Sequence, residues 1–270
     1  MYGIRWQWTL NLFMRTACLF ILLTLSTGCA QDQKSSPASS NTETVPAIPY
    51  YTTIGTIPTP KGYKRTNEAN NSFASWLRKV GLKKDKTVYL YNGSPKRNQS
   101  AQFAVVDIPT GNKDLQQCAD AVMRMRAEYL YAEKNYAQIA FMDYNNKWYK
   151  WNGGSNRPAF DNYLQTVFGW CGSASLEKQL KKVTHFNDMQ IGDVFVQGGF
   201  PGHAMLVADM AMNEKGEKIY LLLQGYQPAQ DMHIVVNPMD ETLSPWYTVN
   251  SEGDINTPEW TFNKENLERW

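Results

Sequence analysis

The section of sequence with most bearing on the fold reads IGDVFVQGGFPGHAMLVADMAMNEKGEKIYLLLQ, from residue 191 to residue 224. Three apolar runs in it, rich in Val, Ile and Leu, predict strands at 194–197, 204–209 and 219–224. A further run predicts a strand at 232–236. Turn residues separate the runs, so we expect adjacent strands of one antiparallel sheet.

Helical patterns dominate the chain before these strands. Apolar residues at helical spacing predict helices at 73–80, at 160–168 and at 176–183. Asp114 is expected to cap a longer helix that reaches residue 130, with Gln117 three residues on completing a capping box. Short strands are also expected at 87–91 and 102–108, and in a hairpin that pairs 139–141 with 148–150. Helices first and a run of strands afterwards favours an α+β fold.

The first 29 residues have the pattern of an export signal. Arg5 and Arg15 precede an apolar run at 17–25 that is too short to span a bilayer. Small residues directly before Cys29 resemble a bacterial lipobox. This resemblance implies cleavage before Cys29, lipid on its thiol, and a lipid-anchored protein of the cell envelope whose partner there is the membrane. An ordinary signal peptide with a coincidental Cys29 is the alternative. Ala30 gives no acidic cue for inner-membrane retention, which favours the outer membrane.

Composition divides the remaining chain. Residues 30–49 contain no aromatic and almost no branched aliphatic residue, which predicts a disordered tether. Residues 50–270 are long enough for a single domain with a substantial core. The chain has 27 Lys+Arg and 25 Asp+Glu; loss of Arg5 and Arg15 with the signal leaves 25 of each. A balanced charge excludes a broad nucleic-acid-binding surface.

One set of polar residues could carry chemistry. Cys171 is expected at the start of a helix, where free N–H groups and the helix dipole would lower the thiol pKa. His203 opens one predicted strand, and Gln224 ends the next. A nucleophilic cysteine needs an imidazole to take its proton and a third polar group to orient that ring. The order Cys171, His203, Gln224 fits these roles.

This order resembles the papain-like cell-wall peptidases of the NlpC and CHAP type. The best-matching motifs are Gly192-Asp193-Val194 and Gly202-His203-Ala204. The resemblance implies a papain-like core of helix and antiparallel sheet at about 158–240, with an N-terminal α/β extension. It also implies Cys171 as nucleophile, His203 as base, Gln224 as orienting residue, and peptidoglycan peptides as substrate. Trp170 departs from the Asp that these peptidases usually place before the nucleophile, and Gly172 departs from the Ser that commonly follows it.

The domain also resembles an uncharacterised family of bacterial lipoproteins, a domain of unknown function. The runs that carry this second resemblance are 118–131, 198–204 and 228–233. Since that family does not always have Cys at the place of Cys171, it could share the peptidase fold without its chemistry.

Two function classes therefore stay open. The first is a cysteine amide hydrolase, which a contact between Cys171 and His203 would favour. The second is a non-catalytic protein that binds a glycan, a peptide or a partner lipoprotein in a groove. A disulfide between Cys118 and Cys171, or a buried Cys171 facing away from His203, would favour binding. The groove residues expected are Trp148, Trp151, Trp170 and Tyr226.

A metal site was the third alternative. His203, Asp209 and His233 could supply ligands, but their spacing resembles no known ligand motif. We therefore expect neither a metal nor a cofactor.

Overall fold

A continuous apolar strand organises the fold of this chain. The computed structural model describes residues 50–249 and 252–270, so the predicted lipobox, Cys29 and the tether lie outside the described residues. Strand β7 (His203–Asn213) is buried over its first nine residues. Layers cover both faces of a strand with such an unbroken apolar pattern, whereas a half-exposed strand would alternate. Strand β8 (Lys218–Gln224), with its three successive leucines, is buried in the same way.

The main sheet forms around these two strands. Its order is β2-β9-β8-β7-β6-β13-β5, with β1 added to β7 and β10 added to β8, and every pairing is antiparallel. The other strands of this sheet are β1 (Tyr63–Arg65), β2 (Gln102–Val105), β5 (Lys181–Lys182), β6 (Val194–Gln197), β9 (His233–Val235), β10 (Tyr247–Thr248) and β13 (Leu267–Arg269). Two hairpins stand apart from it: β3 (Ala140–Met142) with β4 (Trp148–Lys150), and β11 (Ile255–Asn256) with β12 (Thr261–Phe262).

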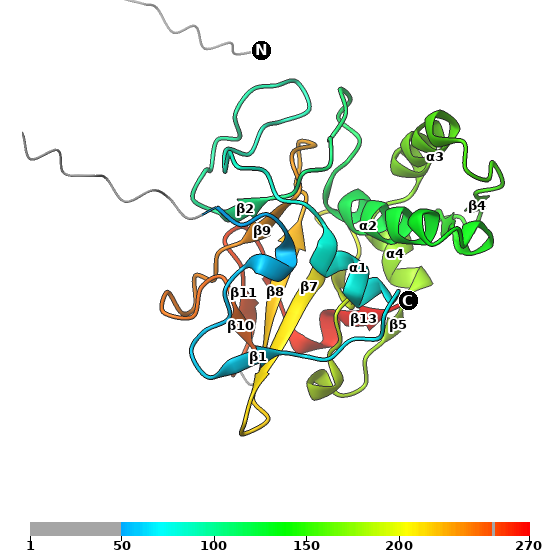
Figure 1. Ribbon diagram of the computed structural model, residues 1–270. Coiled ribbons are helices and arrows are strands. Elements are labelled where there is room, and N and C mark those ends of the chain that lie inside the picture. Colours follow the sequence, from blue (N-terminus) through cyan, green and yellow to red (C-terminus); the bar gives the residue numbers. More distant parts are fainter. Residues whose placement is uncertain (1–49, 250–251) are drawn as a thin grey trace, which may run out of the picture. The chain divides into compact units, whose positions relative to one another are not determined.

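The α-helices pack against the main sheet and against one another. The α-helices are α1 (Phe73–Lys79), α2 (Cys118–Ala132), α3 (Arg157–Trp170) and α4 (Ser173–Gln179). Helices α1 and α2 pack on β7, and α3 and α4 pack on α2 (Figure 1). Short 3-10 turns occur at Ile54–Thr56, Tyr136–Gln138, Phe186–Asp188 and Lys264–Asn266. Within the described ranges, no helix has the length and hydropathy to cross a membrane.

The predicted α+β class is confirmed by this mixture of helices and a large antiparallel sheet. The strand predicted at 194–197 is confirmed, and the next three occur with shifted ends. Strands β1 and β2 belong to the main sheet, and α2 packs on it. The first part of the domain is therefore built into the same layers as residues 158–240.

Three local predictions were also wrong. Residues 87–91 form only isolated bridges, because Tyr89 and Leu90 pair with loop residues. Helix α4 ends at Gln179, since Leu180 has an extended backbone and the next residues form β5. Helix α2 begins at Cys118, four residues after the predicted cap.

The start of α2 is set by a cap from the Asp120 carboxylate. Gln117 is the N-cap residue, and its backbone N–H donates to the Asp120 carboxylate at 3.0 Å. Asp114 instead accepts hydrogen bonds from the Gln117 side chain and from the backbone of Ala229. Cys118 is consequently the first residue of a 15-residue helix rather than an internal one.

Glycine allows that helix start to approach the end of β8. A Cβ atom placed on Gly225 would lie 2.7 Å from the carbonyl oxygen of Gln117 and 3.0 Å from the Ala121 Cβ. Neither neighbour is the free end of a flexible side chain, so the backbones could not stay in place. Gly225 therefore keeps α2 close to the end of the strand that carries Gln224.

We predict that Gly225→Ala lowers the free energy of unfolding by about 1–3 kcal/mol, because it overpacks this contact. Gly169→Ala is the matched control, since no atom lies within 4 Å of the added methyl group in α3. That control should leave the free energy of unfolding unchanged or raise it by about 0.5–1 kcal/mol, because Gly is unfavourable within helices. Urea unfolding measures the free energy of unfolding of both variants. Equal values for Gly225→Ala and the wild type would show that α2 and the end of β8 are not in close contact at Gly225.

Candidate functional site

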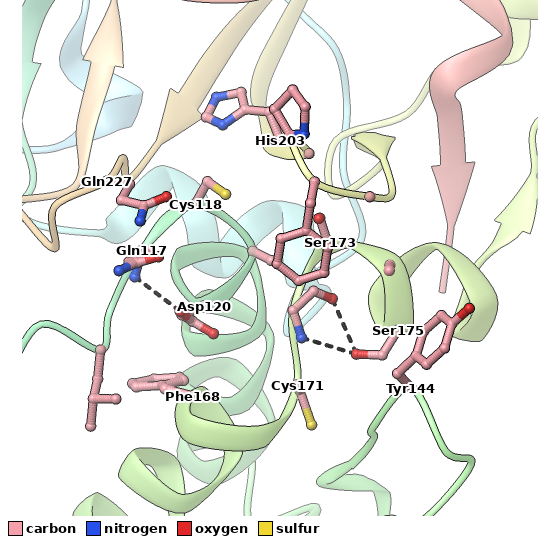
Figure 2. A pocket seen from close by; sticks show the side chains of 18 of the residues that line it. Gln117, Cys118, Asp120, Tyr144, Phe168, Cys171, Ser173, Ser175, His203 and Gln227 are labelled. Atoms are coloured by element: carbon pink, nitrogen blue, oxygen red, sulfur yellow. Dashed lines mark hydrogen bonds between the residues drawn. The ribbon is translucent and has the colours of Figure 1, made fainter. Parts of the chain in front are cut away.

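A groove of about 580 Å³ opens where α2, α3 and α4 meet the sheet (Figure 2). The first turn of α2 forms one wall, and the segment joining α3 to α4 forms another. The loop between β6 and β7 and the residues after β8 complete it. Its polar and sulfur-bearing lining residues include Asp114, Gln117, Cys118, Asp120, Cys171, Ser173, Ser175, His203 and Gln227.

His203 and Gln224 are brought together, as the sequence predicts for a base and its orienting residue. His203 is the first residue of β7 and is 2% exposed; Gln224 is the last residue of β8 and is fully buried. The His203 Nε2 atom lies 3.0 Å from the Gln224 Oε1 atom, within hydrogen-bond distance. The imidazole also packs against Tyr226, Trp260 and Phe262. The ring is thus fixed by one polar contact and three aromatic ones.

Hydrogen bonds around Gln224 define which nitrogen of His203 carries the proton. The Gln224 Nε2 atom donates to the Glu259 carboxylate at 2.8 Å and lies 3.1 Å from His233 Nε2. His233 Nδ1 lies 2.9 Å from the backbone oxygen of Asp231, which can only accept. His233 is therefore protonated at Nδ1 and accepts from Gln224 at Nε2. The Gln224 oxygen then faces His203, so His203 donates through Nε2 and its Nδ1 is free to accept a proton.

Burial keeps both histidines neutral. Desolvation lowers the pKa of His203 to about 4, and the nearby Lys96 ammonium also lowers it while the bond to Gln224 opposes the shift. Desolvation and the Lys96 charge likewise lower the pKa of His233 to about 3. At neutral pH the His203 ring is therefore an uncharged base.

Cys118 lies at the His203 end of the groove. It is drawn next to His203 in Figure 2 and occupies the first position of α2. Burial and the Asp120 carboxyl raise the pKa of the Cys118 thiol to about 11, whereas the backbone N–H groups of Ala119 and Ala204 oppose that shift. Contact with the N–H of Ala204 places the sulfur beside the start of β7, since Ala204 follows His203 directly.

Cys171 is not brought together with His203. Its sulfur points away from His203 in Figure 2, and its backbone N–H donates to Val167, which closes α3. Cys171 is thus the C-cap of α3 rather than the first residue of a helix. Burial, with smaller effects of the Asp120 and Asp143 carboxyls, raises the pKa of its thiol to about 12. The expected helix-start thiolate at Cys171 was therefore wrong, and Cys118 and Cys171 are both free thiols.

Two of the four predicted groove residues line the groove. Trp170 and Tyr226 do so, and Trp170 is 66% exposed. Trp148 lies on β4 away from the groove, and Trp151 is buried, with its indole N–H donating to Gly154. These two residues do not line the groove as predicted, and Trp151 packs on Phe160 and Tyr163 of α3 instead. Four further aromatic residues that the sequence did not indicate line the groove, namely Tyr144, Phe168, Phe200 and Trp260.

Asp209, the third residue considered as a metal ligand with His203 and His233, is engaged in ion pairs. Asp209 is fully buried and forms ion pairs with Arg65 and Arg78, each at 2.7 Å. Across residues 50–249 and 252–270, no group of three His, Cys, Asp or Glu residues is placed to hold a metal ion.

The depressed pKa of His203 predicts how stability changes with pH. Because His203 titrates near 4 when folded and near 6.5 when unfolded, the unfolded chain binds more protons between these values. The contribution of neutral His203 is complete above pH 6.5 and is lost as the pH falls toward 4, by about 3 kcal/mol in all. In urea unfolding at several pH values, the free energy of unfolding of the wild type should fall by this amount relative to that of His203→Gln between pH 6.5 and pH 4. The control is His185→Gln at an exposed histidine, and its free energy of unfolding should change with pH as that of the wild type does. A difference between the wild type and His203→Gln that stays the same at every pH would contradict the lowered pKa of His203.

Comparison with known proteins identifies the family but no activity. The family model described as Domain of unknown function (4846) matches residues 54–157 and 142–269, which together cover most of the chain. No curated protein and no solved structure matches. The chain therefore belongs to the family of the Domain of unknown function (4846).

Proposed function

We propose that this protein is a cysteine amide hydrolase in which Cys118 attacks, His203 accepts the thiol proton, and Gln224 orients the imidazole. One observation carries the proposal. The bond from His203 Nε2 to Gln224 leaves Nδ1 as the basic nitrogen of the ring, and Cys118 lies beside the start of the strand that His203 opens. A thiol, a neutral imidazole and an orienting amide thus lie at one end of the groove, and these are the groups that thiol catalysis uses.

The reaction follows from these positions. The Cys118 proton moves to His203 Nδ1 as the sulfur attacks the amide carbonyl carbon, because thiol and imidazole are both neutral at rest. The negative charge on the carbonyl oxygen meets the N–H groups of the first turn of α2, which have no partners within the helix. The leaving amine takes the proton from Nδ1, and a thioester forms on Cys118. Water, deprotonated by His203, then hydrolyses the thioester and restores the thiol.

The fold supports a papain-like interpretation of this site. Cysteine begins a helix that packs on an antiparallel sheet, His203 opens the central strand, and Gln224 ends its neighbour. The chain order of nucleophile, base and orienting residue is kept with Cys118 in place of Cys171. In this proposal Cys118 takes the role of nucleophile that the likeness to NlpC and CHAP peptidases gave to Cys171.

The groove supports a peptide of the cell wall as the substrate. Trp170, Phe200 and Tyr144 expose large aromatic surfaces at its rim, on three separate segments. Exposed aromatic side chains on a groove rim offer flat, apolar contacts to extended chains. If the lipobox at Cys29 is processed, the domain is held in the cell envelope, where peptidoglycan stem peptides supply amide bonds. We propose attachment to the outer membrane through lipid on Cys29.

A non-catalytic binding protein is the second candidate. Cys171 is buried and faces away from His203, which is the arrangement expected for it. The raised pKa of the Cys118 thiol also favours it, because a thiol at rest is a weaker nucleophile than a thiolate. The same aromatic rim would then hold a peptide or a glycan without cleavage.

Turnover of muropeptides separates the two candidates. We expect Cys118→Ala to abolish turnover, since no other group in the groove could form the thioester beside His203. His203→Ala should lower kcat by about 10²–10⁴, and Gln224→Ala should lower it less. Cys171→Ala is the matched control and should retain activity, because its sulfur faces away from His203. Turnover that survives Cys118→Ala but not Cys171→Ala would reverse the assignment, and no turnover by the wild type would favour binding alone.

The lipid anchor has a test of its own. Cys29→Ser should abolish incorporation of labelled fatty acid and leave unprocessed precursor or soluble protein. Cys18→Ser, which changes the other cysteine of the signal segment, should be labelled and processed as in the wild type. Fractionation of inner and outer membranes locates the product, and normal lipid labelling of Cys29→Ser would exclude the lipobox.

A further inference from the structure

A buried ion pair lies directly behind Gln224. Lys96 is 6% exposed, and its ammonium group lies 2.6 Å from the Glu259 Oε2 atom. Lysine is rarely buried to this extent without a partner. The same Oε2 atom accepts from the Gln224 side chain at 2.8 Å. The charge of Glu259 is therefore shared between Lys96 and the amide that orients His203.

We propose that Glu259, supported by Lys96, is a positioning residue that fixes the orientation of the Gln224 amide and hence the tautomer of His203. The role given to Glu259 rests on the proposed function, because it assumes that His203 acts as a base. The tautomer of His203 can be measured whether or not the protein is a hydrolase. A carboxylate can only accept hydrogen bonds, so beside Glu259 the amide nitrogen of Gln224 must face inward. The Gln224 oxygen then faces His203, which keeps the proton of His203 on Nε2 and leaves Nδ1 free for Cys118.

His233 alone would hold the amide less firmly. It accepts from Gln224 only while its own proton stays on Nδ1, bonded to the Asp231 carbonyl oxygen. A neutral imidazole can move that proton to the other nitrogen, and would then donate to the Gln224 oxygen instead. The hydrogen bond to ionised Glu259 is also roughly twice as strong as one between neutral groups. That shift would cost His233 its bond to Asp231, and Glu259 adds a second, charged acceptor that opposes it.

Lys96 has a second effect on the site. Its positive charge lowers the pKa of both His203 and His233, and pairing with Glu259 limits how strongly it does so. An ion pair here supplies an acceptor for Gln224 without leaving a net charge beside the base. Loop residues 91–100 and the turn between β11 and β12 meet at this pair, which joins two segments far apart in the chain.

Ring-nitrogen NMR of the full-length protein, with ¹⁵N-labelled histidine, tests the proposal without a substrate. The chain has three histidines, of which exposed His185 serves as the internal reference. In the wild type, His203 should be protonated only at Nε2 and His233 only at Nδ1. The variant Lys96→Met/Glu259→Leu removes both charges together, so that neither is left buried and unpaired. It should show both tautomers of His203, with a matching second tautomer of His233.

Two further variants complete the test. Lys96→Arg keeps the ion pair and should keep the wild-type tautomers. Glu259→Gln keeps the size of the side chain but can donate as well as accept, so it should give the same mixture to a smaller extent, even if the double variant fails to fold. A folded double variant whose His203 stays wholly protonated at Nε2 would overturn the proposal, as would a wild-type His203 protonated at Nδ1. If the wild type proves to have no hydrolase activity, these spectra are unaffected. The positioning role of Glu259 and the proposed function can therefore fail separately.

Discussion

The hydrogen bond between His203 and Gln224 is the contact on which the site depends. Its direction is determined by acceptors that lie deeper in the protein, namely the Glu259 carboxylate and the Asp231 carbonyl oxygen. From them, a chain of donors and acceptors runs outward through His233 and Gln224 to His203. Because every member has a defined role in this chain, the outermost nitrogen, His203 Nδ1, is left to face the groove as a base.

Backbone packing brings Cys118 to the His203 end of the groove. Strands β7 and β8 are buried on both faces, so their register is fixed and the ends that carry His203 and Gln224 meet. The N-cap of Gln117 and the absence of a side chain at Gly225 then let α2 start against the end of β8. Cys118 consequently lies at a helix N-terminus beside the start of β7. The contacts that stabilise this region are therefore also those that position the residues of the proposed site.

Some of this arrangement could be predicted from the sequence. Unbroken apolar runs predicted the strands. Because His203 and Gln224 stand at the ends of two adjacent runs, the sequence also predicted that these two residues meet. The position of Cys118 was not predicted, because a cap at Asp114 would put Cys118 inside the helix rather than at its first position. The signal that could have found it is Asp120, three residues after Gln117, since a carboxylate at that spacing caps the backbone N–H of Gln117.

Other features had no local signal. Lys96 and Glu259 are 163 residues apart, and neither has a pattern that predicts burial. Trp148 and Trp151 were expected in the groove because aromatic composition alone does not distinguish a packed cluster from a binding surface. Cys171 follows a helical run, and only the extended backbone that ends α3 shows that its side chain faces away from the base. Long-range packing therefore decides which of the two cysteines lies near His203.

The most direct test of this account is the site of alkylation in the folded protein. Brief treatment with iodoacetamide, followed by peptide mapping, measures the rate at Cys118 and at Cys171 in one experiment. The account predicts that Cys118 reacts first, that His203→Ala slows it, and that Cys171 reacts only after unfolding. Faster labelling of Cys171, or a Cys118 rate that His203→Ala leaves unchanged, would contradict the assignment of Cys118 and His203 as a catalytic pair.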